Sequence, residues 1–574
     1  MSPNRDSLTK GEKSLQDHSN LLPRKQLILC LSIVSLAQLI SFIDQNGIST
    51  ALPTIAADLD ARNTISWAGT ASLLANTTFS MLYGRLSDIF GRKTIFISAI
   101  LLLAIADLVC GLSMNATMFY VFRGVAGIGS GGITNLAMII TSDVVTLEQR
   151  GKYQGIIGSM IGLGSVTGPF LAAGFVLRST WRGLFWLLAP LGVLNALVAF
   201  WFLPSKKPTI TFKEGMKKVD YLGVLTSSIG TIFLLIPISG GGAYFAWSSP
   251  LVISMLAIGA SSLILFVVVE WKFAKIPMMP GNIFIGLLAD KATVAVYGRP
   301  AIVILLVQSF LLGAVYQSTV YYIPLYLQNA HRYSAIVSAA IFSSLAGIQA
   351  IMSALSGLCI TRFKNYGQVI RFGFAMWTLG AGLMLIFGRD TNAGVLVIIL
   401  LIAGVGVGCV FQPMLVALQA HSTKSRRAVI ISNRNFNRSA GGACGLAISA
   451  AVLQAQLRST LPTQYSDLAD SPYSLRDSND SIPTSVLDAY MSASHLVFII
   501  QVPLIGACFL GSLFVKDRGL APLDEKPTTS NIQPVGAESG GIQNTDGELR
   551  QVESHNGESY EGHSSVAQSK DKRS

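Results

Sequence analysis

The sequence predicts an all-α membrane protein with fourteen transmembrane helices, and two observations predict it: the composition and the length of the apolar runs. Of the 574 residues, 51% are hydrophobic and only 13% are Asp, Glu, Lys or Arg, whereas about 25% are charged in an ordinary soluble domain. The mean hydropathy is +0.53. Because so many apolar residues cannot share one core, the lipid bilayer must solvate much of the surface. The composition therefore excludes a water-soluble globular protein.

The chain contains fourteen apolar runs, each bounded by charged or turn-forming residues. A helix needs about 20 mostly apolar residues to cross about 30 Å of hydrocarbon. The first run follows the polar segment 1–26 and is too long for a cleaved signal peptide, so we expect it to be retained. The predicted spans lie near residues 27–52, 67–84, 94–113, 118–141, 153–176, 183–203, 221–240, 251–270, 300–327, 335–360, 368–388, 393–420, 428–453 and 495–515.

The basic residues are distributed unevenly between the two sides of this predicted bundle. The net charge is +12, and 31 of the 42 Lys and Arg residues lie in the eight segments on the side of the two tails. Only 7 lie in the opposite loops, and 4 lie within or at the ends of spans. Basic loops mark the cytosolic side, so we expect both tails in the cytosol. The charge surplus then reflects topology, with the lipid bilayer and no nucleic acid as partner.

An internal repeat predicts two bundles. Shifting the chain by 277 residues aligns, without a gap, residues of spans 4 and 5 with those of spans 12 and 13: Ala126, Gly127, Gly129, Gly131, Arg150, Gly164 and Gly168 with Ala403, Gly404, Gly406, Gly408, Arg427, Gly441 and Gly445. The shift covers eight spans, so we predict six spans, an inserted pair and six more. The parts are a cytosolic tail (1–26), a first bundle (27–203), the inserted pair with its loops (204–299), a second bundle (300–515) and a disordered cytosolic tail (516–574).

The second bundle contains a long predicted external loop, residues 454–494. Within it, Asn479-Asp480-Ser481 fits the pattern of an N-glycosylation acceptor, and we expect modification at Asn479.

Between spans 2 and 3 lies a short, glycine-bounded and basic connection with the sequence GRLSDIFGRK, residues 84–93. Glycines at both ends permit a tight turn, and the acid can pair with a neighbouring arginine. The segment resembles the G-x-L-a-D-r-x-G-r-k signature of the major facilitator superfamily, with Ser87 and Ile89 as departures. The resemblance implies a conformational switch formed by Gly84, Arg85, Asp88, Gly91 and Arg92.

Further residues resemble the fourteen-span drug:proton antiporter family, especially its fungal multidrug and toxin-efflux members. Span 1 carries Asp44, span 4 begins with Arg123-Gly124, and span 5 contains Gly164, Gly168 and Pro169, similar to the antiporter motif of that family. Ala172-Ala173 stand where a glycine pair is usual. The resemblance covers residues 26–515 and implies two bundles around a central cavity, alternating access, proton-coupled export and function as a monomer. The cell membrane is the expected location, and the vacuolar membrane fits the same topology.

Two charged residues at membrane depth are the candidates for proton coupling. Asp44 lies about midway through its apolar run, where a carboxylate must be protonated, paired or facing a wet cavity. We predict that it couples transport to protons or attracts a cationic substrate; the alternative is a neutral carboxyl with one structural hydrogen bond. Arg123 could extend its side chain to the membrane surface, but the family resemblance places it inward, beside a proton-carrying acid.

Three more charges in the spans have open interpretations. Asp107 lies near the outer end of span 3, and we expect it at the membrane interface rather than in a proton relay. Arg434 and Arg438 are four residues apart and share one face of span 13. They fit contact with an anionic substrate and contact with lipid head groups equally well.

The expected substrate is a small lipophilic compound such as a drug, toxin or secondary metabolite, because aromatic and apolar walls suit it. Candidate cavity residues are Asn46, Gln308, Gln317, Tyr321, Tyr322 and Gln412. The alternatives are a carrier of a defined metabolite, such as a basic amino acid or siderophore, and a non-transporting receptor. No G-x-x-x-x-G-K-S/T loop occurs in the sequence, so we expect an ion gradient rather than ATP as the energy source. No C-x-x-C pair and no cluster of His, Cys or paired carboxylates occurs either, so we expect no enzyme activity, cofactor or metal.

Overall fold

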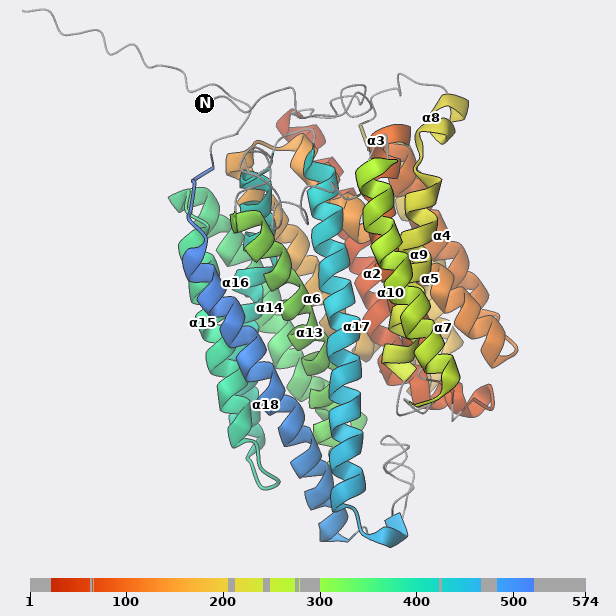
Figure 1. The fold of residues 1–574 in the computed structure, drawn as a ribbon, viewed down its shortest axis with the longest axis vertical. Helices are drawn as coiled ribbons and strands as arrows, with labels where there is room; N and C mark the ends of the chain where they lie inside the picture. The colour runs from red at the N-terminus through yellow and green to blue at the C-terminus, as the bar shows by residue number, and fades with distance from the viewer. Residues whose placement is uncertain are drawn as a thin grey trace, which may run out of the picture. The chain divides into compact units, whose positions relative to one another are not determined.

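The protein consists of long helices, shown in a computed structural model that describes residues 22–61, 64–65, 67–204, 212–240, 248–273, 278, 300–422, 426–465 and 483–520 (Figure 1). Within these ranges there are fourteen long helices, a short helix α8 (Phe212–Lys218) and a 3₁₀ turn (Met384–Ile386). The long helices are α2 (Arg24–Asp58), α3 (Trp67–Phe90), α4 (Arg92–Gly111), α5 (Ala116–Val144), α6 (Leu147–Arg178), α7 (Arg182–Phe202), α9 (Tyr221–Gly240), α10 (Pro250–Lys272), α13 (Pro300–Asn329), α14 (Ala335–Phe363), α15 (Gly367–Leu383), α16 (Ala393–Ala420), α17 (Arg427–Thr460) and α18 (Thr484–Phe514). Each overlaps one predicted span, which confirms the all-α fold class, although α17 and α18 extend into the predicted external loop 454–494.

Thirteen of these helices are long and apolar enough to cross a bilayer, and α3 is the exception. Its centre is rich in Asn, Ser and Thr, and these side chains are satisfied inside the protein. Thr77 and Thr78 donate to the carbonyls four residues earlier at 2.8 Å, and Asn76 donates to Ser130 Oγ of α5 at 3.3 Å. Because protein rather than lipid surrounds this stretch, α3 does not need an apolar composition.

The predicted connection between spans 2 and 3 is largely helical. Helix α3 continues to Phe90 and α4 begins at Arg92, so Gly91 alone joins the two helices. Gly91 has φ = 90°, a conformation that favours glycine over other residues. The expectation of a connection over residues 84–93 was therefore wrong, since Gly91 alone makes this tight turn.

The repeat predicted from glycine spacing is confirmed by helix packing. Gly164 and Gly168 of α6 lie against α2, the first helix of the first bundle, whereas their counterparts Gly441 and Gly445 of α17 lie against α13, the first helix of the second. In the same way, Gly127 of α5 lies against α3, and its counterpart on α16 lies against α14. The same glycines thus allow the same close helix contacts in both bundles.

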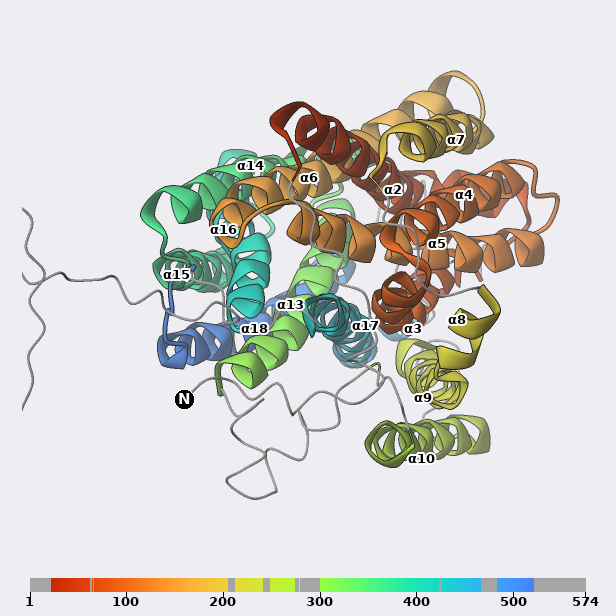
Figure 2. The ribbon, with the colours of Figure 1, turned by 90° about the horizontal axis from the view of Figure 1, so that it is seen from above.

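The two bundles meet along two seams, and the inserted pair lies beside one of them. Helices α6 and α14 form one seam, and α3 and α17 form the other. Helix α9 contacts both α3 and α17, and α10 packs on α9. Figure 2 shows this pair beside the α3–α17 seam, on the far side of the bundles from α14. The inserted helices therefore cover one seam only.

We call the end of the bundle that carries residues 24, 91, 150, 364 and 422 the basic end. There, residues 515–520 follow α18 and pack against the second bundle. Asp517 accepts a hydrogen bond from the amide of Gly367, the first residue of α15, at 2.7 Å, and the Tyr366 hydroxyl lies 3.1 Å from His421 Nε2. Burial lowers the pKa of His421 and raises the pKa of Tyr366. Both side chains are therefore neutral at neutral pH.

Candidate functional site

The first bundle contains an ion pair in its interior. Arg123 Nη1 of α5 lies 2.6 Å from Asp44 Oδ1 of α2, and the two side chains are 1% and 0% exposed. Arg123 therefore points inward, as the family resemblance implies, and its side chain does not reach the membrane surface. Among the described residues, Asp44 Oδ2 and Arg123 Nε have no hydrogen-bond partner. Such a pair costs a large desolvation energy, which its own attraction must offset.

A second carboxylate lies beside this pair. Asp107 of α4 is fully buried, within electrostatic range of Arg123 and within hydrogen-bonding range of Asp44. The expectation of an interfacial position was wrong. Asp107 is the fifth residue from the end of α4 at Gly111, and Arg123 is the eighth residue from the start of α5 at Ala116. Because these two helix ends are neighbours, the two side chains lie at similar depth and can meet. Counting residues from this shared end is the signal that would have found Asp107.

The glycines of the antiporter-like motif form the close contact between α6 and the helix turns around Asp44. A Cβ at Gly164 would lie 2.7 Å from Phe42 Cβ, and a Cβ at Gly168 would lie 2.7 Å from the Ile43 carbonyl oxygen. Pro169 follows inside α6. The motif therefore places the backbone of α6 directly against the part of α2 that carries Asp44.

The second bundle contains two inward-facing arginines on α17. Arg434 is fully buried and donates to the Phe411 carbonyl at 2.7 Å and to Asn435 Oδ1 at 2.9 Å, but its Nε has no partner. Arg438, one turn further along, is half-buried. Both guanidinium groups lie 5.9 Å from the centre of the Phe411 ring. Within the described ranges, neither arginine forms an ion pair with a carboxylate.

Polar side chains connect the two bundles near these arginines. Asn46 of α2 donates to Ser165 Oγ of α6 at 3.3 Å. Tyr316 of α13 lies within hydrogen-bonding range of Ser165 and within electrostatic range of Arg438, and its hydroxyl donates to Gln349 of α14 at 3.4 Å. Sequence reasoning did not select Ser165, Tyr316 or Gln349, because single polar residues in apolar runs have no distinguishing spacing.

The other predicted cavity residues lie in different surroundings. Gln412 is buried, and neither polar atom of its amide has a hydrogen-bond partner within the described ranges. Tyr321 lies within electrostatic range of Arg123, and Gln317 lies against Gly442 of α17. In contrast, Gln308 donates to the Cys508 carbonyl at 2.7 Å and Tyr322 donates to the Leu446 carbonyl at 3.4 Å. These last two residues pack between helices, so we do not include them in the proposed cavity. Asn479 lies outside the described residues.

The predicted switch residues form a charged cluster at the basic end. Arg92 binds Asp88 at 2.7 Å and Asp143 of α5 at 2.9 Å, and Arg85 lies 3.7 Å from Asp88. Gly84 contacts the second bundle, because a Cβ there would lie 2.5 Å from Ser432 Oγ of α17. The cluster therefore ties α3, α4 and α5 together beside the α3–α17 seam.

More contacts close the other seam near the same end. Lys152 of α6 donates its amide to Thr361 of α14 at 2.9 Å, and Ser159 donates to the Ala350 carbonyl at 2.6 Å. Lys364 binds Glu148 at 2.7 Å. The bundles thus make direct contact at the basic end along both seams.

Two bundles related by an internal repeat, with charged residues buried inside them, are typical of secondary transporters. Within the described residues there is no group of three or more His, Cys, Asp or Glu side chains that could hold a metal ion. The chain belongs to the Major Facilitator Superfamily, whose sequence profile matches residues 34–446. It is therefore a membrane transporter.

Comparison with known proteins supports this assignment. The chain is 47% identical over 530 residues to "Citrate exporter 1" of Yarrowia lipolytica, covering 90% of this chain and 77% of that protein. It is 42% identical over 540 residues to "MFS-type transporter clz4" of Cochliobolus lunatus, covering 94% of each. It is 32% identical over 441 residues to "Efflux pump dotC" of Dothistroma septosporum, covering 77% and 74%. The resemblance to fungal efflux pumps is thus confirmed.

Solved structures show the same fold. The proton:xylose symporter XylE matches with a TM-score of 0.56 at 12% identity, covering 87% of this chain and 98% of that chain. The human organic anion transporter MFSD10 matches with a TM-score of 0.53 at 14% identity, covering 84% and 100%.

Proposed function

We propose that the protein is a proton-coupled exporter of small organic carboxylates. The observation that carries this proposal is the arginine pair of α17, since Arg434 is fully buried and neither it nor Arg438 has a carboxylate partner among the described residues. A buried guanidinium without a counter-ion is costly. A carboxylate substrate would supply that charge, and the planar guanidinium fits a carboxylate with two parallel hydrogen bonds.

A relative supports the substrate class. The protein that shares 47% identity with this chain over 530 residues is named a citrate exporter, and citrate carries several carboxylates. We therefore choose citrate as the first probe.

Proton coupling is proposed for the Asp44–Arg123 pair in the other bundle. A carboxylate that is 0% exposed and bonded to one arginine can bind a proton when conformational change exposes it to water on either side. For an anionic substrate the sign of coupling follows from charge. A bound proton makes the interior more positive, so the proton and the carboxylate favour each other's binding and should move in the same direction.

The second candidate is the one that the sequence predicts, an antiporter of lipophilic compounds. The rings of Tyr316 and Phe411, 4.9 Å apart beside the arginines, favour it, as does the relative named an efflux pump. A cationic substrate and a proton would compete, since each adds positive charge to the same interior. Transport by a carboxylate exporter and transport by a cation antiporter should therefore be driven by proton gradients of opposite direction.

The test uses purified protein in proteoliposomes loaded with radiolabelled citrate. We expect citrate efflux that increases when the pH falls on the citrate side, and that is lost in Arg434→Gln and Arg438→Gln. The control is Arg389→Gln, because Arg389 forms an exposed ion pair with Asp488 at the opposite end. Efflux of a lipophilic cation driven by an opposing pH gradient, without citrate efflux, would favour the second candidate. Unchanged citrate efflux in both α17 variants would overturn the role of the arginines.

We further propose that the protein acts as a monomer in the cell membrane, with its basic end in the cytosol. The charge distribution supports this orientation, and the vacuolar membrane would give the same one. Fluorescence of a tagged protein separates the two membranes, and a mobility shift on deglycosylation tests the external position of Asn479.

A further inference from the structure

We infer that Asp107 is a proton-binding residue of the transporter and that one proton is shared between the carboxyl groups of Asp107 and Asp44 while Arg123 stays charged. This inference rests on the proposed proton coupling and names the group that holds the proton. Three observations carry it: hydrogen-bond partners that are missing, the charge balance of the site, and the apolar cavity in which Asp107 lies.

The missing partners point to a proton. Asp107 is fully buried, and neither of its carboxyl oxygens accepts a hydrogen bond from any residue that the structure describes. Asp44 Oδ2 also lacks a donor, although Asp107 lies within hydrogen-bonding range of Asp44. Two ionised carboxylates only accept hydrogen bonds and would repel each other. If Asp107 carries a proton, it donates to Asp44, and one hydrogen bond satisfies a buried oxygen on each side.

The charge balance of the site also indicates one bound proton. Asp44 and Asp107 supply two negative charges and Arg123 supplies one positive charge, which remains because guanidinium does not lose its proton in proteins. The ion pair of Asp44 and Arg123 at 2.6 Å already uses that charge. With one proton on Asp107 the site is neutral. Without it, the site holds one uncompensated negative charge in a low-dielectric interior, which is costly.

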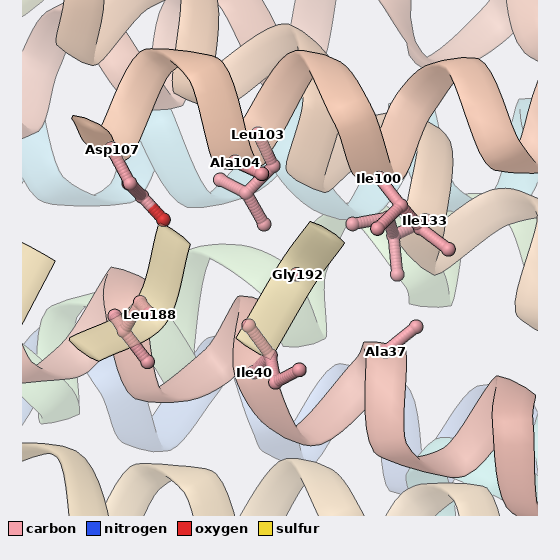
Figure 3. A pocket seen from close by; sticks show the side chains of 9 residues that line it. All are labelled: Ala37, Ile40, Ile100, Leu103, Ala104, Asp107, Ile133, Leu188 and Gly192. Carbon is pink, nitrogen blue, oxygen red and sulfur yellow. The ribbon is translucent and has the colours of Figure 1, made fainter. Parts of the chain in front are cut away.

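The surroundings offer no other compensation. Figure 3 shows Asp107 at one end of a small cavity between α2, α4, α5 and α7, whose other lining side chains are apolar. Helix α7 contributes Leu188 and Gly192 to its wall. In the part of the chain that the structure describes, the other ionisable groups near the three-residue site are Cys110, one turn along α4, and Tyr321 of α13, which lies near Arg123. Neither carries a positive charge that could replace the proton.

This arrangement can couple the proton to the movement of the bundles. In the buried state described above, the O–H bond of Asp107 remains intact and the site is neutral. When a conformational change admits water, that bond can break, the proton leaves to water, and Asp107 keeps the electron pair as a carboxylate. The ionised site then favours the hydrated conformation, so returning to the buried state requires a proton again.

The first experiment detects the proton without any substrate. The infrared carbonyl stretch of protonated carboxylic acids is recorded in wild type, Asp107→Asn, Asp107→Glu and Asp58→Asn, with ¹³C-labelled aspartate to identify the bands. We expect a band in wild type that is lost in Asp107→Asn, retained in shifted form in Asp107→Glu, and unaffected in Asp58→Asn, because Asp58 forms a separate ion pair with Arg182 in which its side chain is 44% exposed. Absence of the band in wild type, or an unchanged band in Asp107→Asn, would overturn the inference.

The second experiment separates this inference from the proposed function. Exchange of labelled for unlabelled citrate needs no net proton movement, whereas net efflux does. We expect Asp107→Asn to retain exchange and to lose the pH dependence of net efflux, and Asp107→Glu to restore it. If wild type moves no citrate while the infrared band behaves as expected, the substrate proposal fails and the proton site stands. If Asp107→Asn keeps the full pH dependence, the proton site fails while the export function stands.

Discussion

Replacing Arg123 with Gln should destabilise the protein more than replacing Asp44 with Asn. After Arg123→Gln, the buried acids Asp44 and Asp107 lose their cationic partner, and both must take up protons to remain neutral. After Asp44→Asn, Arg123 can still pair with an ionised Asp107. The three-residue site therefore predicts an asymmetry that an isolated ion pair would not produce.

The magnitude follows from burial. Removing one partner of a buried pair typically costs about 3–5 kcal/mol, and the exposed fractions of 1% and 0% place this pair in that class. We expect a loss near that range for Arg123→Gln. For Asp44→Asn we expect about 1–2 kcal/mol, the cost of losing one charged hydrogen bond when another acid replaces it. The double variant Arg123→Gln/Asp44→Asn should lose less stability than the two single variants added together, because it removes both charges of the pair and leaves neither one unpaired.

Unfolding by sodium dodecyl sulfate in mixed micelles, at fixed pH, measures these free energies. Asp107→Asn in the Asp44→Asn background is the informative third variant, since it removes the replacement acid and should bring the loss up to that of Arg123→Gln. Equal losses for Arg123→Gln and Asp44→Asn, or strict additivity in the double variant, would refute the shared site and leave an ordinary ion pair.

Three more outcomes are expected. Gly441→Leu should cost about 1–3 kcal/mol or more through overpacking, measured by the same unfolding assay, whereas Gly382→Leu, with open space around it, should be neutral. Gly84→Val should leave citrate binding intact but slow transport, because it separates α3 from Ser432 at the basic end; normal transport would argue against that contact. Burial lowers the pKa of His421, so the unfolded chain binds the extra proton as the pH falls below about 6.5. Stability should therefore decrease from pH 7.5 to 6, and less so in His421→Gln.

The sequence was sufficient to predict the fold because membrane spans depend on length and composition, both of which are local. The repeat could be predicted because close helix packing requires glycine at defined positions, such as Gly164 and Gly441. The boundary between spans 2 and 3 could not be predicted in the same way, since Arg92 at this boundary pairs with Asp88 and with the distant Asp143 of α5. Ion pairs between distant segments are not visible in local patterns.

Only part of the candidate site could be predicted, again because contacts between distant segments are not visible in local patterns. Asp44 and Arg123 were recognisable one by one, as charges at membrane depth, and family resemblance supplied their inward orientation. Their contact, 79 residues apart along the chain, and the nearby Asp107 depend on how α2, α4 and α5 pack. Arg434 and Arg438 could be placed on one face, but only tertiary packing decides whether that face meets lipid or the interior.

The α6–α14 seam has a consequence for the speed of the transport cycle. Near the basic end its contact surface is largely main chain and small residues, with Gly151 and Gly155 of α6 facing Gly357 of α14. Surfaces of this kind hold few interdigitated side chains, so they can separate and rejoin without a series of rotamer changes. The activation barrier for opening that end should then come mainly from the few hydrogen bonds and ion pairs across the seam, and mutations there could tune turnover without altering affinity.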